Sequence, residues 1–165
     1  MLYSRLFSPE EYRAVLESVK GTPYWIGGDK SIGLYLADTG ELILSQDDIK
    51  AYWSNSHSIE LNFGGIIRWN SYIDTTGTPK LAQSLFSREF IIKFNNTEVC
   101  RGVFYSLASS ASYKGIAIID ALLPLDSAHD QLWIISDYPN NSLGPEYAGV
   151  ASELAVAFAE MNLLR

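Results

Sequence analysis

The fold is decided by residues 86–122, FSREFIIKFNNTEVCRGVFYSLASSASYKGIAIIDAL. Residues 90–94 are β-branched and aromatic and alternate between two faces, which is typical of a strand. Asn95 and Asn96 follow, and asparagine tolerates the positive φ that a two-residue hairpin turn requires. Residues 97–106 alternate again. The pattern therefore predicts that residues 90–94 and 98–105 pair as an antiparallel hairpin.

A polar connection and a second apolar run complete this stretch. Residues 109–112 are serine-rich, as is common in loops. The run from Gly115 to Leu122 is too short to span a membrane and fits a buried central strand.

Elements on either side of the stretch can be recognised by their caps and their periodicity. Ser8, Pro9 and Glu11 predict the start of an N-terminal helix, because they combine a cap, a first-turn proline and a capping-box acid. Pro145 opens the last helix, in which Leu154 and Phe158 are four residues apart and are therefore predicted to be buried together. Further strands are predicted at residues 24–26, 32–36, 41–44, 58–63 and 132–135.

These elements predict an α+β fold in a single domain covering residues 1–165. We expect a mainly antiparallel sheet of about five to seven strands, with the N- and C-terminal helices packed on one face. The length suffices for one domain with a sizeable core.

Composition and charge exclude several classes of protein. The formal net charge is −7, which argues against nucleic acid or an anionic membrane as the main partner, since both attract clustered Lys and Arg. No apolar run is long enough for a membrane-spanning helix, and the N-terminal MLYSRLFSPEEY has no signal-peptide core, so a soluble protein is expected. The compartment is not fixed by these features.

The residues that commonly carry catalysis or bind metals are few. The two histidines, His57 and His129, have no second His or carboxylate at ligand spacing, so neither a metal nor a cofactor is expected. Cys100 lies within a predicted strand and is interpreted as a packed thiol. A GxSxG elbow is absent, but a Ser/His/Asp site assembled in space around His57 stays open.

Aromatic side chains around the hairpin suggest a binding surface. Arg101 lies on a strand among apolar residues and needs either solvent or a partner. The predicted surface consists of Trp53, His57, Arg101, Tyr105, Ser109 and Tyr113. It offers π surfaces, a cation and hydroxyls, a combination suited to an extended peptide or a partner subunit. The alternative is that Arg101 pairs with a nearby acid and the aromatic rings only pack.

Residues 58–105 also show a resemblance to a known family. The segment SIELNFGGI…LAQSLFSREFIIKFNNTEVCRGVF is similar to part of the extracytoplasmic domain of the SecD subunit of the protein-export motor. The matching order is a strand (59–63), a helix (79–86), a strand (90–94) and an outgoing strand (98–104). The resemblance implies a ferredoxin-like α+β unit. A role in export is not carried over from it, because SecD spans the membrane several times and no span is predicted in this chain.

Two classes of function follow from these patterns. The first is a non-enzymatic binding or assembly module that uses the aromatic and polar surface or a sheet edge, with a peptide, another protein or a second copy of this chain as partner. The second is a small hydrolase or small-ligand enzyme with a Ser/His/Asp site. The absence of a catalytic motif favours the first.

Overall fold

The computed structural model describes residues 30–72, 85–119 and 123–165. The chain divides into two units, Met1–Lys30 and Ser31–Arg165, and every strand and helix named below belongs to the second. The helix predicted from Ser8, the strand at 24–26 and most of the helix at 79–86 lie outside the described residues, as does the end of the strand predicted to reach Leu122.

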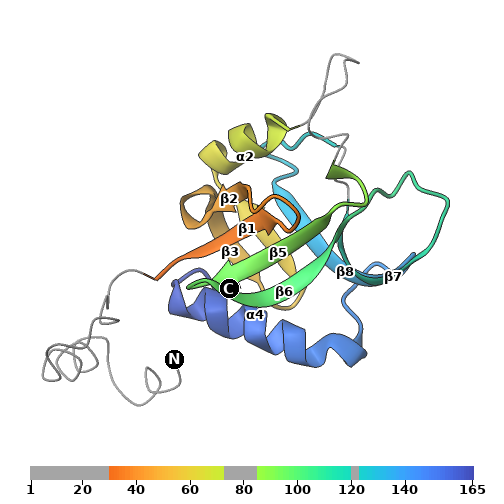
Figure 1. The fold of residues 1–165 in the computed structure, drawn as a ribbon. Coiled ribbons are helices and arrows are strands. Elements are labelled where there is room, and N and C mark those ends of the chain that lie inside the picture. The colour runs from red at the N-terminus through yellow and green to blue at the C-terminus, as the bar shows by residue number, and fades with distance from the viewer. Residues whose placement is uncertain (1–29, 73–84, 120–122) are drawn as a thin grey trace, which may run out of the picture. The chain divides into compact units, whose positions relative to one another are not determined.

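The described part of the second unit contains one sheet of eight strands (Figure 1). The strands are β1 (Ile32–Leu36), β2 (Leu42–Ser45), β3 (Ile49–Trp53), β4 (Ser58–Leu61), β5 (Glu89–Phe94), β6 (Thr97–Phe104), β7 (Tyr113–Ile118) and β8 (Gln131–Tyr138). Their order across the sheet is β2-β1-β5-β6-β7-β8-β4-β3. The helices are α2 (Phe63–Asn70) and α4 (Ala148–Glu160), with short 3₁₀ turns η2 (Gln46–Asp48) and η3 (Pro145–Tyr147).

The connection between β2 and β3 forces this sheet to curl. These strands are at opposite edges of the sheet, yet only the three residues of η2 separate them. Eight flat strands would place the two edges about 33 Å apart, because neighbouring strands lie about 4.8 Å apart. The chain from Ser45 to Ile49 reaches at most about 14 Å. The sheet therefore bends into a half-barrel whose edges approach each other at η2.

Polar contacts fix the corner at η2. Ser45 caps the turn and its backbone N–H donates to the Asp48 carboxylate at 2.9 Å. The Asn62 side chain donates to the Asp47 carbonyl at 2.6 Å and accepts from the Gly65 N–H at 2.9 Å. Gly65 passes so close to the Asp48 carbonyl that a Cβ would collide with it. Helix α2 is thereby held against the corner.

Among the described residues the buried apolar side chains form two clusters, and the larger one is the main core. Its fully buried side chains come from the strands and from both helices, and the largest include Trp69 of α2 and Phe158 of α4. Phe158 stacks on Tyr52 with ring centroids 4.6 Å apart, and α4 packs against β3 and β6. In Figure 1 α4 lies below the sheet and α2 above it.

Two predictions about local structure are confirmed. Strands β5 and β6 pair as an antiparallel hairpin, and Asn95 and Asn96 take positive φ values of 49° and 66° in its turn. Leu154 and Phe158 are both 0% exposed on the face of α4 that meets the sheet.

The predicted fold class is wrong. The chain forms a curled, mixed half-barrel of eight strands with two short helices in the described residues, rather than a ferredoxin-like antiparallel sheet with flanking helices. Strand β3 escaped prediction because a bulge between Ile49 and Ala51 breaks its alternation. Residues 105–112 do not form a hairpin turn; they carry the chain back, so that β7 pairs with β6 in parallel.

Both edges of the sheet are partly occupied from within the chain. The C-terminal residues add to β3: Tyr52 N–H donates to the Leu163 carbonyl and Arg165 N–H to the Tyr52 carbonyl, each at 2.8 Å. At the other edge the Arg68 guanidinium donates to the carbonyls of Ile43 and Leu42 at 3.0 and 3.3 Å. These contacts reduce the main-chain groups that an added strand could use.

None of the helices in residues 30–72, 85–119 and 123–165 has the length and apolar character needed to cross a bilayer.

Candidate functional site

Three of the residues predicted to bind a partner lie together, but they bond to one another. The Tyr105 ring is 5.7 Å from Tyr113 and 5.2 Å from Tyr138, between ring centroids. The Tyr105 hydroxyl donates to the Ala111 carbonyl at 2.7 Å and accepts from Ser109 Oγ at 3.1 Å. Tyr105 is only 6% exposed. This cluster fastens the serine-rich loop to the sheet.

The other three predicted residues lie elsewhere on the sheet. Arg101 forms ion pairs with Glu98 at 2.9 Å and with Glu89 at 3.4 Å. This is the alternative given above, in which Arg101 pairs with a nearby acid. Through its bond to Glu98, Arg101 holds the pKa of the Glu98 carboxyl below its usual value. Trp53 is on β3, four strands from β6, and His57 is in the turn after it, with Nδ1 3.4 Å from the Tyr52 hydroxyl.

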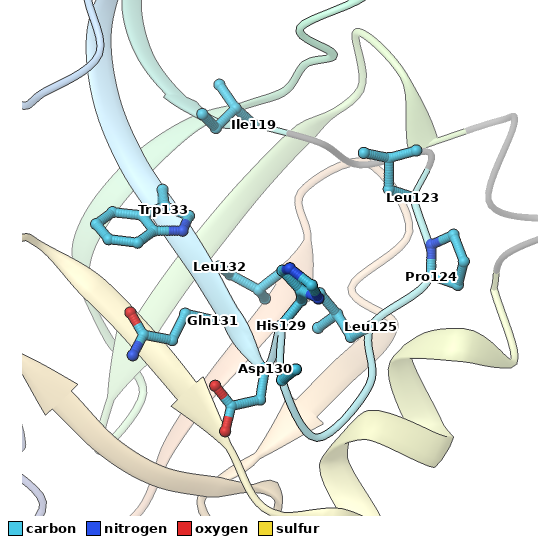
Figure 2. A pocket seen from close by; sticks show the side chains of 10 residues that line it. Ile119, Leu123, Pro124, Leu125, His129, Asp130, Gln131, Leu132 and Trp133 are labelled. Carbon is cyan, nitrogen blue, oxygen red and sulfur yellow. The ribbon is translucent and has the colours of Figure 1, made fainter.

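A hollow beside strand β8 provides a different candidate site. Its volume is about 600 Å³, within the range of small-ligand pockets. We call it the β8 hollow; its lining residues are Ile119, Leu123, Pro124, Leu125, Ala128, His129, Asp130, Gln131, Leu132 and Trp133. Figure 2 shows Asp130, Gln131 and Trp133 projecting to one side of β8, with residues 123–125 beyond its other side. Leu123 and Trp133 are 54% and 40% exposed.

The segment that leads into β8 is held in place by polar contacts. The Asn70 side chain of α2 bonds to Leu125 twice, donating to its carbonyl and accepting from its N–H, each at 2.8 Å. The Asp126 carboxylate accepts from the N–H groups of Ala128 and His129 at 2.8 Å. The wall of the β8 hollow at residues 125–129 is therefore anchored to α2 and to its own turn.

Two carboxyl groups interact at the start of β8. Glu60 is on β4, which pairs with β8, and its carboxyl interacts with that of Asp130. Glu60 Oε1 accepts from Trp53 Nε1 at 2.8 Å, and Glu60 Oε2 is 3.3 Å from Lys50 Nζ. The hydrogen bond from Trp53, followed by that from Lys50, lowers the pKa of Glu60.

Of these two carboxyl groups, that of Asp130 stays protonated to the higher pH. Burial, and then the charge of Glu60, raise the pKa of Asp130 above its ordinary 3.8. Because one carboxyl is stabilised as an anion and the other is not, the two groups separate in their titration. The arrangement places a carboxyl whose pKa is raised above its ordinary value on the wall of the β8 hollow.

Tryptophan side chains flank this carboxyl pair on one face of the sheet. Trp53 pairs with Ser58 and Ser58 with Trp133, so the three side chains form a row across β3, β4 and β8. Trp53 is 37% exposed, whereas Ser58 is buried and donates to Gln131 Oε1 at 2.8 Å. The row leaves two indole rings partly exposed near Glu60.

Local sequence patterns do not reveal the residues of the β8 hollow. Glu60 and Trp133 lie within predicted strands, and alternation indicates only which residues of the same strand share a face with each of them. The pairing of β4 with β8 joins segments about 70 residues apart, and local patterns do not encode such pairing. In the sequence, Asp130 is distinguished only as the neighbour of His129.

Comparison of the chain with protein-family models, curated proteins and solved structures finds no match in any of the three. The resemblance of residues 58–105 to the SecD domain stays a prediction.

The carboxyl pair gives a prediction about stability and pH. The folded-state pKa of Asp130 lies above its unfolded value, so folding binds protons and stability falls as pH rises through that window. Asp130→Asn removes this penalty. We expect the variant to melt at a higher temperature than the wild type near pH 7, with the difference shrinking toward about pH 4.

Asp126→Asn is the matched control for this measurement. Backbone N–H bonds from Ala128 and then His129 lower the pKa of Asp126, so its charge stabilises the fold above the unfolded pKa. We expect this variant to melt at a lower temperature near pH 7. If both substitutions changed the melting temperature near pH 7 in the same direction, the opposite roles assigned to the two carboxyls would be contradicted.

Proposed function

We propose that this protein is a binding module whose ligand places an apolar group in the β8 hollow, against Trp133. The supporting observation is that two large apolar side chains, 40% and 54% exposed, line one hollow of about 600 Å³. Isolated exposed apolar residues are common, but a concave set of them beside a few polar groups is typical of binding sites.

The chemistry of the hollow suits recognition of a ligand. Trp133 offers a large rigid surface, and covering it with a ligand removes apolar area from water with little loss of side-chain entropy. Gln131 and Asp130 supply polar atoms at the rim of the same wall. Such polar groups orient a ligand whose affinity comes mainly from apolar contact.

Two other modes of action, addition of a partner strand at a sheet edge and hydrolysis at a Ser/His/Asp site, have less support. Both sheet edges already bond to other parts of the chain, at Leu163 and Arg165 and at Arg68. A ligand bound through side chains therefore fits better than an added strand. For a hydrolase, His57 should approach a carboxylate and a serine; among the described residues its ring bonds instead to the Tyr52 hydroxyl.

Titration with phenethyl alcohol, a neutral probe with one aromatic ring, tests the proposal. We expect the indole N–H signal of Trp133 to shift in two-dimensional NMR spectra, and Trp133→Ala to weaken binding at least about fivefold, equivalent to about 1 kcal/mol. The indole signal is assigned by its loss in Trp133→Phe.

Trp53→Ala is the matched control, because Trp53 is similarly exposed but does not line the β8 hollow. It should leave the affinity for phenethyl alcohol within about twofold. The absence of any shift up to the solubility limit of the probe, or an equal loss in both variants, would contradict the proposed site.

A further inference from the structure

We infer that the ligand of the β8 hollow is a small apolar amine, and that Asp130 receives its ammonium group. This inference rests on the proposed function and specifies the ligand class of the same site. Three observations support it: Asp130 lines the β8 hollow, the neighbouring Glu60 is already bonded to other side chains, and the charges around Asp130 are mainly negative.

Asp130 is the one carboxyl-bearing residue among the described lining of the β8 hollow. The interacting Glu60 has both oxygens engaged, one by Trp53 Nε1 at 2.8 Å and the other near Lys50 Nζ at 3.3 Å. In the described part of the chain no Lys or Arg lies within ion-pair distance of Asp130. The Asp130 carboxyl therefore lacks a cation, whereas its neighbour has one.

The charges around Asp130 would be balanced by one additional positive group. Glu60 faces it from β4, Lys50 approaches through Glu60 from β3, and His129 precedes it with Nδ1 3.2 Å from Asp126. When both carboxyls are ionised, two negative charges face the single Lys50 ammonium. A bound ammonium at Asp130 would balance them and form a charge-assisted hydrogen bond.

Other ligand classes fit these groups less well. An anion would approach two carboxyls in a protein whose net charge is −7. A metal ion needs several protein ligands, and the described residues contain no group of three or more His, Cys, Asp or Glu that could hold one. The volume of about 600 Å³ is that of a small-molecule pocket, which favours a small amine over a protein surface.

Three probes with the same ring and different head groups test the inference on the full chain: phenethylamine, phenethyl alcohol and hydrocinnamate. Near pH 8 we expect the amine to bind about tenfold more tightly than the alcohol, as one charge-assisted hydrogen bond would provide, and the carboxylate to bind most weakly. Dissociation constants come from calorimetry or NMR titration.

Asp130→Asn keeps the shape of the side chain and removes its charge. We expect this variant to bind amine and alcohol equally, so that the roughly tenfold preference of the wild type for the amine is lost. Asp47→Asn changes the net charge by the same amount on an exposed turn away from the hollow, and it should keep the preference for the amine.

The pH dependence of the wild type gives a second measurement that needs no variant. The preference for the amine should fall as pH is lowered through the titration of Asp130, whereas the affinity for the alcohol should stay constant. A preference that persists in Asp130→Asn, or that does not change with pH, would overturn the role of Asp130. Equal binding of amine and alcohol by the wild type would overturn the inference and leave the proposed function standing; failure of every probe would overturn both.

Discussion

Phe158→Ala is expected to lower the free energy of unfolding by about 3–5 kcal/mol. Phe158 is 0% exposed and stacks on Tyr52, itself 0% exposed, with ring centroids 4.6 Å apart. The substitution removes this contact and leaves a cavity between α4 and β3, which the sheet cannot close by a small movement because its neighbours are packed on all sides. Urea denaturation followed by far-UV circular dichroism measures the loss.

Phe63→Ala is the matched control for this prediction. It makes the same chemical change on α2, where the Phe63 side chain is 78% exposed. Since little apolar area is lost from the folded state, the change in unfolding free energy should stay within about 0.5 kcal/mol. Comparable losses in the two variants would show that burial of Phe158 does not explain its effect.

Gly102→Ala should destabilise the protein by about 1–3 kcal/mol, although it adds a single methyl group. Gly102 lies where β6 passes close to β7, and a Cβ at this position would collide with the Ile116 carbonyl and lie 2.9 Å from the Phe90 ring. The carbonyl belongs to the backbone of a central strand, so relief of the clash requires the two strands to separate. A thermal or urea melt of the variant measures the cost.

Gly149→Ala provides a control with the opposite expected sign. This glycine is in α4, and a Cβ there would meet nothing within 4 Å. Alanine is the better helix former, so this variant should gain up to about 1 kcal/mol. If Gly102→Ala also stabilised the protein, the close approach of β6 to β7 would be refuted.

The position of Gly102 also connects the fold to the proposed site. Strand β7 touches β6 on one side and pairs with β8 on the other, and β8 carries Trp133 and follows directly on Asp130. A strand displaced at Gly102 would therefore disturb the wall of the β8 hollow. Loss of phenethyl alcohol binding in Gly102→Ala would follow from the fold and would not assign Gly102 to the site.

The local elements of this protein were determined by its sequence. The hairpin of β5 and β6 follows from alternating apolar residues around two asparagines, because strand periodicity and positive-φ turns depend on residues close in the chain. The burial of Leu154 and Phe158 follows from their spacing on one helix. Each of these features requires information from only a few neighbouring positions.

The order of the strands and the candidate site were decided by the tertiary structure. The curl of the sheet depends on β2 and β3 lying at opposite edges, and the carboxyl pair depends on β4 lying beside β8. Alternation says which side chains share a face of a strand, but it does not say which strand becomes the neighbour. Glu60 and Asp130 lie close together only because β4 pairs with β8. That pairing depends on the burial of apolar side chains from segments that are far apart in the sequence.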